Sequence, residues 1–218
     1  MQEKPVLIFD FDGTIADTFT PTMEILRVEY EKWGDYFHRR HTINQLRSLT
    51  IWQIIHTIPG GWWKFVYLLM RAKKHIHAHA HQIKAYPGIV YTLNTLYDQG
   101  YQMYIVTSND VPSVQNFLRQ YDLDTVFADI MPTKGLWRKA KTLKKLCRRY
   151  QIPIKSTLYF GDEIRDIQAC QQIGMPVVSL TYGYNSQIGL ERFKPDYLVK
   201  KPTQILTLLQ TYPQKHQS

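Results

Sequence analysis

The chain has 218 residues, 44% hydrophobic and 21% charged, which suits one globular domain or one domain with a modest insertion. This composition argues against a disordered or fibrous protein, and two cysteines, Cys147 and Cys170, are too few for a disulfide-rich scaffold. A formal net charge of +9 favours anionic partners. We find no secretory signal and no apolar run of the roughly 20 residues that a membrane span needs. We therefore expect a cytoplasmic protein.

Short apolar runs that end in polar residues recur along the chain, at 6–9, 103–106, 158–160 and 176–180. Continuous apolar runs of this length are typical of strands that are buried on both faces. Helical patterns separate the runs, at 89–99, 111–121, 137–150 and 164–173. This alternation predicts an α/β fold with a Rossmann-like, doubly wound parallel sheet and helices on both of its faces.

Residues 16–84 break the alternation. Apolar residues there, such as Met23 and Trp33, recur at helical spacing, and no run is typical of a strand. We therefore predict an all-helical domain at 16–84, inserted after the first strand. The α/β core domain would then consist of residues 1–15 and 85–218.

Carboxylates and a hydroxyl follow three of the predicted strands. Asp10 and Asp12 follow the first strand, Ser108 the second and Asp162 the third. Ligands bind outside the carboxyl ends of the strands in such sheets, so we expect these side chains to share one rim. Clustered carboxylates stay ionised only beside a cation, and oxygen ligands without Cys or His favour Mg²⁺. A Mg²⁺ site beside a free carboxylate suits phosphoryl transfer to an aspartate.

The segment Asp10-Phe11-Asp12-Gly13-Thr14 resembles the D-x-D-G-T signature of the haloacid dehalogenase superfamily. Three further segments resemble other motifs of that superfamily, in the same order along the chain. They are Ser108-Asn109, Gly161-Asp162-Glu163 with Asp166, and residues 195–199. The predicted insertion lies where the phosphoglycolate-phosphatase-like branch carries its helical C1 cap. The resemblance covers about residues 4–210.

The resemblance implies a Mg²⁺-dependent phosphomonoester hydrolase, a phosphatase that acts through an aspartyl-phosphate intermediate. Asp10 would be the nucleophile, and Asp12 would act as general acid and then as general base. The Mg²⁺ ligands would be Asp10, the backbone carbonyl of Asp12, and Asp162. Asp166 would support this set of ligands or join it.

Groups beside the phosphate are also implied by the resemblance. Ser108 would donate a hydrogen bond to a phosphoryl oxygen, and the adjacent Thr107 is the alternative. Thr14, with its hydroxyl and N–H, and Asn109 are further candidates for substrate binding.

A basic residue must offset the charge of the transferring phosphoryl group. Lys139 fits the family's K-x-x-x-L pattern best, and Lys134 and Lys141 are its competitors. Within the insertion, Arg47 is our candidate for a residue that reaches the substrate, with a surface position as the other interpretation.

Three remaining features have structural interpretations that we favour over functional ones. The seven basic residues within 138–149 predict a solvated helix face more than a nucleic-acid-binding surface. The alternating histidines predict a polar helix or hinge, with a zinc or copper site as the alternative; they are His75, His77, His79 and His81. The aromatic residues within 52–70 are expected in the insertion's core, with a hydrophobic lid, dimer face or membrane contact as alternatives.

The expected partner is a small phosphorylated metabolite, with no nucleic acid, and the chain would be a monomer or a homodimer. A phosphomutase or a phosphonatase on the same scaffold is the alternative activity. A dehalogenase is disfavoured, because that branch lacks the carboxylate that Asp12 supplies here. A catalytically silent binding module is the alternative of another class, but the nucleophile, acid/base and metal aspartates are all in place.

Overall fold

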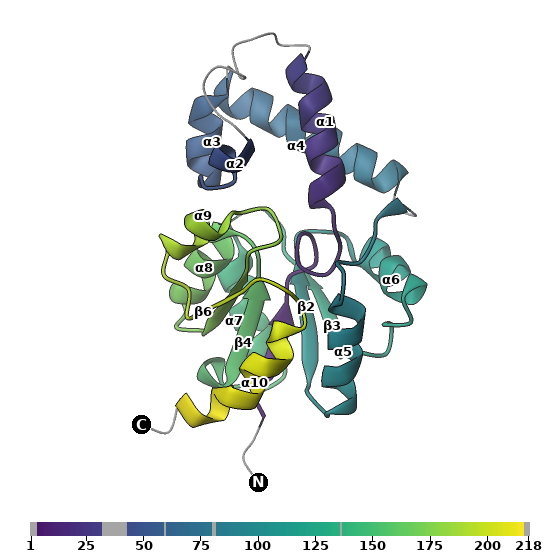
Figure 1. The fold of residues 1–218 in the computed structure, drawn as a ribbon, viewed down its shortest axis with the longest axis vertical. Coiled ribbons are helices and arrows are strands. Elements are labelled where there is room, and N and C mark those ends of the chain that lie inside the picture. Colours follow the sequence, from purple (N-terminus) through teal and green to yellow (C-terminus); the bar gives the residue numbers. More distant parts are fainter. Residues whose placement is uncertain (1–3, 32–42, 59, 80–81, 136, 216–218) are drawn as a thin grey trace.

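The computed structural model describes residues 4–31, 43–58, 60–79, 82–135 and 137–215. Parallel strands form a six-stranded sheet in the order β3-β2-β1-β4-β5-β6, which confirms the predicted parallel α/β fold (Figure 1). The strands are β1 (Val6–Phe9), β2 (Met103–Thr107), β3 (Asp129–Pro132), β4 (Thr157–Gly161), β5 (Val177–Leu180) and β6 (Tyr197–Val199).

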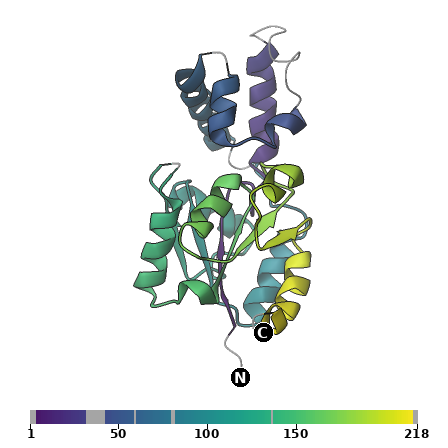
Figure 2. The ribbon, with the colours of Figure 1, turned by 90° about the vertical axis from the view of Figure 1, so that its left-hand side faces the viewer.

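Helices cover both faces of the sheet, as Figure 2 shows from the side. One face packs against α5 (Ile89–Asp98), α6 (Val111–Gln120) and α10 (Gln204–Lys215). The other face packs against α7 (Lys139–Arg149), α8 (Ile164–Gln171) and α9 (Gln187–Glu191), and a short 3₁₀ helix, Ile154–Ser156, precedes β4. No helix in the described part of the chain is long and apolar enough to cross a membrane.

Alternate residues of the central strand β1 enter the two layers of the core. Leu7 and Phe9 lie in the layer under α5 and α10, whereas Ile8 lies in the layer under α7 and α8. Phe9 stacks on Phe160 of β4, with the ring centroids 4.6 Å apart. The two strands that lead directly into Asp10 and Asp162 are therefore fixed side by side by their own core residues.

The start of one helix differs from its prediction, and the elements that the prediction missed include β3, α9 and α10. Helix α7 begins at Lys139 rather than 137, and the other three predicted core helices end within two residues of their predicted ends. The edge strand β3 was not anticipated, because it has only four residues and ends in Pro132. Helix α10 was not anticipated either, although Ile205, Leu209 and Tyr212 are buried at helical spacing.

Between β1 and α5, the described residues include helices that lie over the carboxyl ends of the strands (Figure 1). They are α1 (Phe19–Glu31), α2 (Ile43–Leu46), α3 (Ile51–Thr57) and α4 (Gly61–Ala78), around a small core that includes Ile55, Phe65 and Leu68. Ala16 and Ala85 pair as an antiparallel bridge, so the chain leaves the sheet and returns to it at neighbouring points. Trp33, His81 and the side chain of His77 lie outside the described residues.

The expectation that the aromatic residues within 52–70 are buried is wrong for the three tryptophans of that segment. The exposed fractions of Trp52, Trp62 and Trp63 are 53%, 41% and 82%. The reason is that α4 packs against α1 and α3 along one stripe only, which carries Phe65, Leu68 and Ala72. Its remaining faces have no second layer of helices to cover them in the described part of the chain.

Helix α7 has the amphipathic pattern expected for a solvated basic face. Leu143, Leu146 and Cys147 are buried against the sheet. The exposed residues of the helix are Lys141, Lys144, Lys145, Arg148 and Arg149. Lys139, at the first position of the helix, is buried instead.

We predict that Phe160→Ala lowers the free energy of unfolding by about 3–5 kcal/mol, because it removes the stacked partner of Phe9 and leaves a cavity between β1 and β4. Tyr97→Ala, at an exposed position of α5, should change it by less than about 0.5 kcal/mol. Urea unfolding followed by circular dichroism measures both values. Equal effects of the two substitutions would show that the Phe9–Phe160 stack does not fix these strands.

Candidate active site

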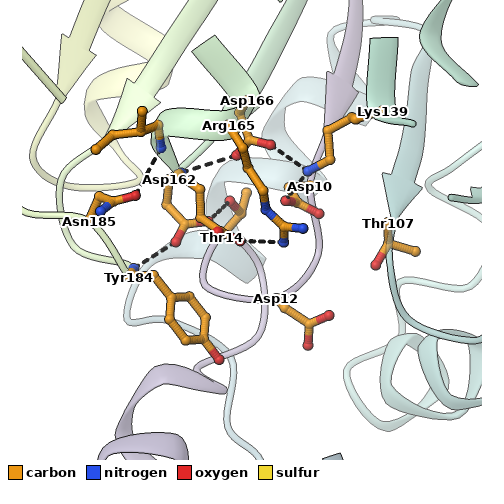
Figure 3. A network of polar contacts seen from close by, with 12 residues as sticks. Asp10, Asp12, Thr14, Thr107, Lys139, Asp162, Arg165, Asp166, Tyr184 and Asn185 are labelled. Atoms are coloured by element: carbon orange, nitrogen blue, oxygen red, sulfur yellow. Dashed lines mark hydrogen bonds and ion pairs between the residues drawn. The ribbon is translucent and has the colours of Figure 1, made fainter. Parts of the chain in front are cut away.

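Two carboxylates stand at the carboxyl ends of adjacent central strands. Phe9 and Phe160 are register partners, so Asp10 directly after β1 and Asp162 directly after β4 come close together. Asp166 lies in the first turn of α8, on the side facing them, and all three residues are buried. Each of the three offers an oxygen, and these oxygens lie within 4.8 Å of one another (Figure 3).

Lys139 is the cation that the structure brings to this cluster. Its Nζ lies 2.5 Å from Oδ2 of Asp10 and also pairs with Oδ1 of Asp166. Its competitors in the sequence, Lys134 and Lys141, are exposed. The position of Lys139 at the start of α7 explains this difference, because only the first turn of that helix reaches the rim of the sheet.

The cluster carries more negative than positive charge in a place that water does not reach. Burial raises the pKa of Asp10 to about 7, although Lys139 acts against the shift. Burial, together with the charge of Glu163, raises the pKa of Asp162 well above its usual range. The pKa of Lys139 is raised, since the attraction of Asp10 and Asp166 exceeds the opposing effect of burial. The lysine therefore stays charged and holds Asp10 in place.

Asp162 is positioned by donors from two loops. It accepts hydrogen bonds from the Thr14 hydroxyl at 2.8 Å and from the Tyr184 backbone N–H at 2.7 Å. A Cβ at Gly183 would lie 2.2 Å from Oδ2 of Asp162, and a Cβ at Gly13 would lie 2.3 Å from the same atom. Only glycine fits at either position, so both loops approach the carboxylate through bare backbone. Thr14, a predicted substrate contact, is directed to Asp162 instead.

Asp12 lies in the turn after Asp10 and outside the three-carboxylate cluster. The Asn109 side-chain amide donates to its Oδ1 at 3.3 Å, and Thr18 also hydrogen-bonds to it. Burial raises the pKa of Asp12, against the effect of these hydrogen bonds. A carboxyl group held in this way is suited to donate a proton.

The hydroxyl predicted beside the phosphate has two candidates at the end of β2. Thr107 is the last residue of the strand and is buried, and its Oγ1 accepts a hydrogen bond from the Asn109 N–H at 3.0 Å. Ser108 follows in the loop and is partly exposed. Figure 3 shows Thr107 beside Asp10 and Asp12, so the alternative to Ser108 stays open.

Arg47 lies between the insertion and the core. Its guanidinium donates to the carbonyls of Gly183 at 2.8 Å and Tyr184 at 3.2 Å and lies over the ring of Phe19. A second hydrogen bond joins the same two segments, because the side-chain amide of Asn185 donates to the Arg47 carbonyl at 2.7 Å. Arg47 therefore joins the insertion to the loop that holds Asp162, and in this arrangement it is half-buried.

A second contact between insertion and core is aromatic. Trp52 of α3 stacks on Trp137, just before α7, with centroids 5.4 Å apart and the planes inclined by 11°. Both rings are about half exposed. Together with the Arg47 contact, this stack places the insertion over the rim that carries the carboxylates.

The donor set fits the predicted Mg²⁺. Asp10, Asp162 and Asp166 offer only hard oxygen ligands, and one lysine does not balance three buried carboxylates. Within the described ranges they form the only group of at least three Asp, Glu, His or Cys close enough to share an ion. His75, near the end of α4, and His79, just after it, stack with ring centroids 4.1 Å apart, and the other two histidines of the tract are not among the described side chains.

Sequence reasoning missed three contributors to the site. Arg165 reaches the carboxylates from α8, and Tyr184 and Asn185 come from the loop after β5. The signal for the loop was present, because it also follows the carboxyl end of a strand. Arg165 gave no such signal, since it lies between two motif residues in a helix.

Comparison with known proteins agrees with this geometry. The sequence profile of the haloacid dehalogenase-like hydrolases matches residues 7–180. The chain belongs to this family. The match runs from within β1 to the end of β5 and includes every strand-end carboxylate described above.

Individual relatives cover most or half of the chain. A phosphoglycolate phosphatase from Synechococcus elongatus is 26% identical over 92% of this chain and 94% of its own length. One from Pasteurella multocida is 34% identical over 57% of each chain. Among solved structures, a haloacid dehalogenase-like hydrolase from Streptococcus pneumoniae has a TM-score of 0.75 at 19% identity, covering 95% of this chain and 99% of its own. A predicted phosphoglycolate phosphatase from Haemophilus somnus has a TM-score of 0.71 at 21% identity, with the same coverage.

We predict that Gly183→Ala destabilises the protein by about 1–3 kcal/mol, because the added methyl group would overlap the Asp162 carboxylate. Asp162→Ala in the same chain should restore part of the loss, since it removes the group that the methyl meets. Thermal unfolding of the wild type, both single variants and the double variant forms the required cycle. Strictly additive effects would contradict the proposed overlap.

Proposed function

We propose that this chain is a phosphatase that hydrolyses a small phosphorylated metabolite through an aspartyl-phosphate at Asp10. The observation that carries the proposal is the buried Asp10 carboxylate, held by Lys139 beside two further carboxylates under a helical insertion. The phosphatase names of the relatives support the same reaction class.

Asp10 and Asp12 have separate roles in this proposal. One oxygen of the Asp10 carboxylate attacks phosphorus and forms the aspartyl-phosphate, while the bond between phosphorus and the ester oxygen breaks. The Asp12 carboxyl group is partly buried, which raises its pKa, and it donates its proton to the leaving alkoxide. Asp12 then accepts a proton from the water that attacks the aspartyl-phosphate, which releases phosphate and restores Asp10.

Lys139 and a hydroxyl at the end of β2 stabilise the negative charge of the phosphoryl group. Lys139 already contacts the nucleophile, so its ammonium lies where negative charge develops on the transferred oxygens. Thr107 or Ser108 donates a hydrogen bond from the end of β2. Asn109 keeps Asp12 in position through its side-chain amide.

We further propose that Asp10, the backbone carbonyl of Asp12, and Asp162 hold Mg²⁺, with Asp166 fixing Lys139 beside them. A bound Mg²⁺ would neutralise the carboxylates and offset the charge of the phosphoryl group. Thr14 and the Tyr184 N–H orient Asp162 for this role.

We also propose that residues 16–84 act as a cap domain on the core of residues 1–15 and 85–218. The contacts of Arg47 and Trp52 with the core hold the insertion over the carboxylates. A site covered in this way excludes water and large substrates, which favours a small phosphomonoester.

Asp10→Asn should abolish Mg²⁺-dependent release of phosphate from p-nitrophenyl phosphate and from 2-phosphoglycolate, because an amide cannot serve as the nucleophile. The loss should be at least about 10³-fold in kcat. Asp98→Asn, on the exposed end of α5, is the matched control and should keep full activity. An active Asp10→Asn variant would rule out the aspartyl-phosphate route.

Mg²⁺ should raise the melting temperature of the wild type by several degrees, because an ion that binds only the folded chain stabilises it by about 2.7 kcal/mol at 100 times its Kd. Asp162→Asn should remove most of this rise, and Asp98→Asn should retain it. Differential scanning calorimetry with and without Mg²⁺ measures the shift. If Asp162→Asn kept the full rise, the ion would bind elsewhere.

A further inference from the structure

The insertion and the adjoining part of the core carry an exposed aromatic face that the proposed chemistry does not use. Six of the ten large hydrophobic residues that are exposed in the described part of the chain belong to it. Helix α4 contributes four of them, and α3 and the segment before α7 contribute one each. The members of this aromatic face are Trp52, Trp62, Trp63, Tyr67, Met70 and Trp137.

Ring stacking makes the aromatic face continuous from the insertion to the core. Trp52 stacks on Trp62 with the ring centroids 6.3 Å apart, and on Trp137 with the centroids 5.4 Å apart. The three rings therefore form a row that leads from α4 through α3 to the start of α7. Figure 2 shows the same order from the side, with the blue helices of the insertion above the green helices of the core.

Helix α4 is apolar on two opposite sides in its first half. Phe65 and Leu68 are buried in the core of the insertion. Trp63, Tyr67 and Met70 follow one another at helical spacing and form an exposed stripe, and 82% of Trp63 is accessible. A surface helix that served only its own core would carry polar residues on this outer stripe. An exposed apolar stripe of this kind is typical of a contact surface.

Basic side chains border the aromatic face. The second half of α4 carries Arg71, Lys73 and Lys74, all of which are exposed. Helix α7, which follows Trp137 closely, carries five more exposed basic residues. The sequences of α3, α4 and α7 contain no acidic residue. The charge of this region therefore calls for a partner that is anionic as well as apolar.

Two other kinds of partner fit these features less well. A second copy of the chain would bring basic residues to the contact again, and these three helices offer no acidic residue to pair with them. A nucleic acid would need open ring faces on which its bases stack, whereas Trp52, Trp62 and Trp137 stack on one another. An anionic bilayer meets both requirements, because Trp and Tyr favour the headgroup region and Lys and Arg bind lipid phosphates.

We propose that the aromatic face docks on an anionic lipid surface, with α4 lying along the headgroup region. Trp63, Tyr67 and Met70 enter the boundary between headgroups and acyl chains, and Lys73 and Lys74 contact the lipid phosphates. The chain then binds a membrane reversibly, without a helix that spans it. This docking is independent of the proposed phosphatase function, because it uses none of the residues with a catalytic role.

Co-sedimentation with vesicles tests the proposal on the whole chain. Vesicles of phosphatidylcholine with about 30% phosphatidylglycerol should bind the wild type at least about 10-fold more tightly than vesicles of phosphatidylcholine alone. Raising NaCl to about 0.5 M should weaken this binding, since the Debye length shortens. A protein that stays in the supernatant with both kinds of vesicle would overturn the proposal.

Two variants separate the apolar and the charged parts of the contact. Trp63→Gln should weaken binding to the anionic vesicles about 10-fold, because its indole no longer enters the bilayer boundary. Lys73→Gln together with Lys74→Gln should weaken it about 10- to 30-fold. Full binding by both variants would contradict the assigned surface. If Trp63→Gln did not fold, Met70→Gln, at a position that is 60% exposed, replaces it with a loss in the same direction.

Matched controls remove similar groups elsewhere. Tyr91→Gln removes an exposed ring from α5 and should bind the vesicles like the wild type. Lys200→Gln together with Lys201→Gln lowers the net charge by the same amount as the α4 pair, at exposed positions after β6, and should retain most of the binding. Equal losses in the two lysine pairs would show that net charge alone attracts the vesicles, and the aromatic face would then have no role.

The other two partners are tested without vesicles. Trp63→Gln should leave the sedimentation coefficient of the chain unchanged, whereas a dimer that dissociates in this variant would assign the aromatic face to a second copy. Fluorescence anisotropy with a labelled single-stranded RNA should give the same affinity for the wild type and Trp63→Gln. An RNA affinity that depends on Trp63 and exceeds the affinity for anionic vesicles would replace the lipid by a nucleic acid.

Discussion

The crowding of three buried carboxylates around one lysine is the constraint on which the rest of this site depends. Asp10, Asp162 and Asp166 come from β1, the end of β4 and α8, so no local segment could bring them together. The stacked core of Phe9 and Phe160 fixes the two strands, and Lys139 offsets part of the charge. The negative charge that remains uncompensated would favour binding of a cation at this site.

The loops around the cluster are shaped by the need to reach these carboxylates. Gly13 and Gly183 have no room for a side chain next to Asp162, while the Thr14 hydroxyl donates to its Oδ1 and the Tyr184 N–H to its Oδ2. The loop that contains Gly183 also accepts the guanidinium of Arg47. The orientation of the Asp162 carboxylate and the contact with the insertion thus depend on one loop, so a movement of the insertion would change the position of Asp162.

The sequence was sufficient for the parts of the fold that are dictated by continuous patterns. The buried strands, the helices between them and the aspartates at the strand ends were predicted because apolar runs and chain topology determine them. Lys139 was preferred on a family motif, and the structure places it on Asp10. The exposure of Trp63 and the direction of Arg165 depend on which neighbours cover a helix, and no single-chain pattern records that. The short edge strand β3 lacked a pattern long enough to detect.

The antiparallel bridge between Ala16 and Ala85 has a consequence for how such a protein can diversify. The backbone N–H of Asp17 donates to the Lys84 carbonyl and that of Tyr86 to the Ile15 carbonyl, so the two crossings form one narrow stem. Any inserted segment with adjacent ends can be attached to this stem without shifting the strand that carries Asp10. The core is in this sense a reusable module, and exchange of the helices above it offers a route to new substrates that leaves the reaction itself intact.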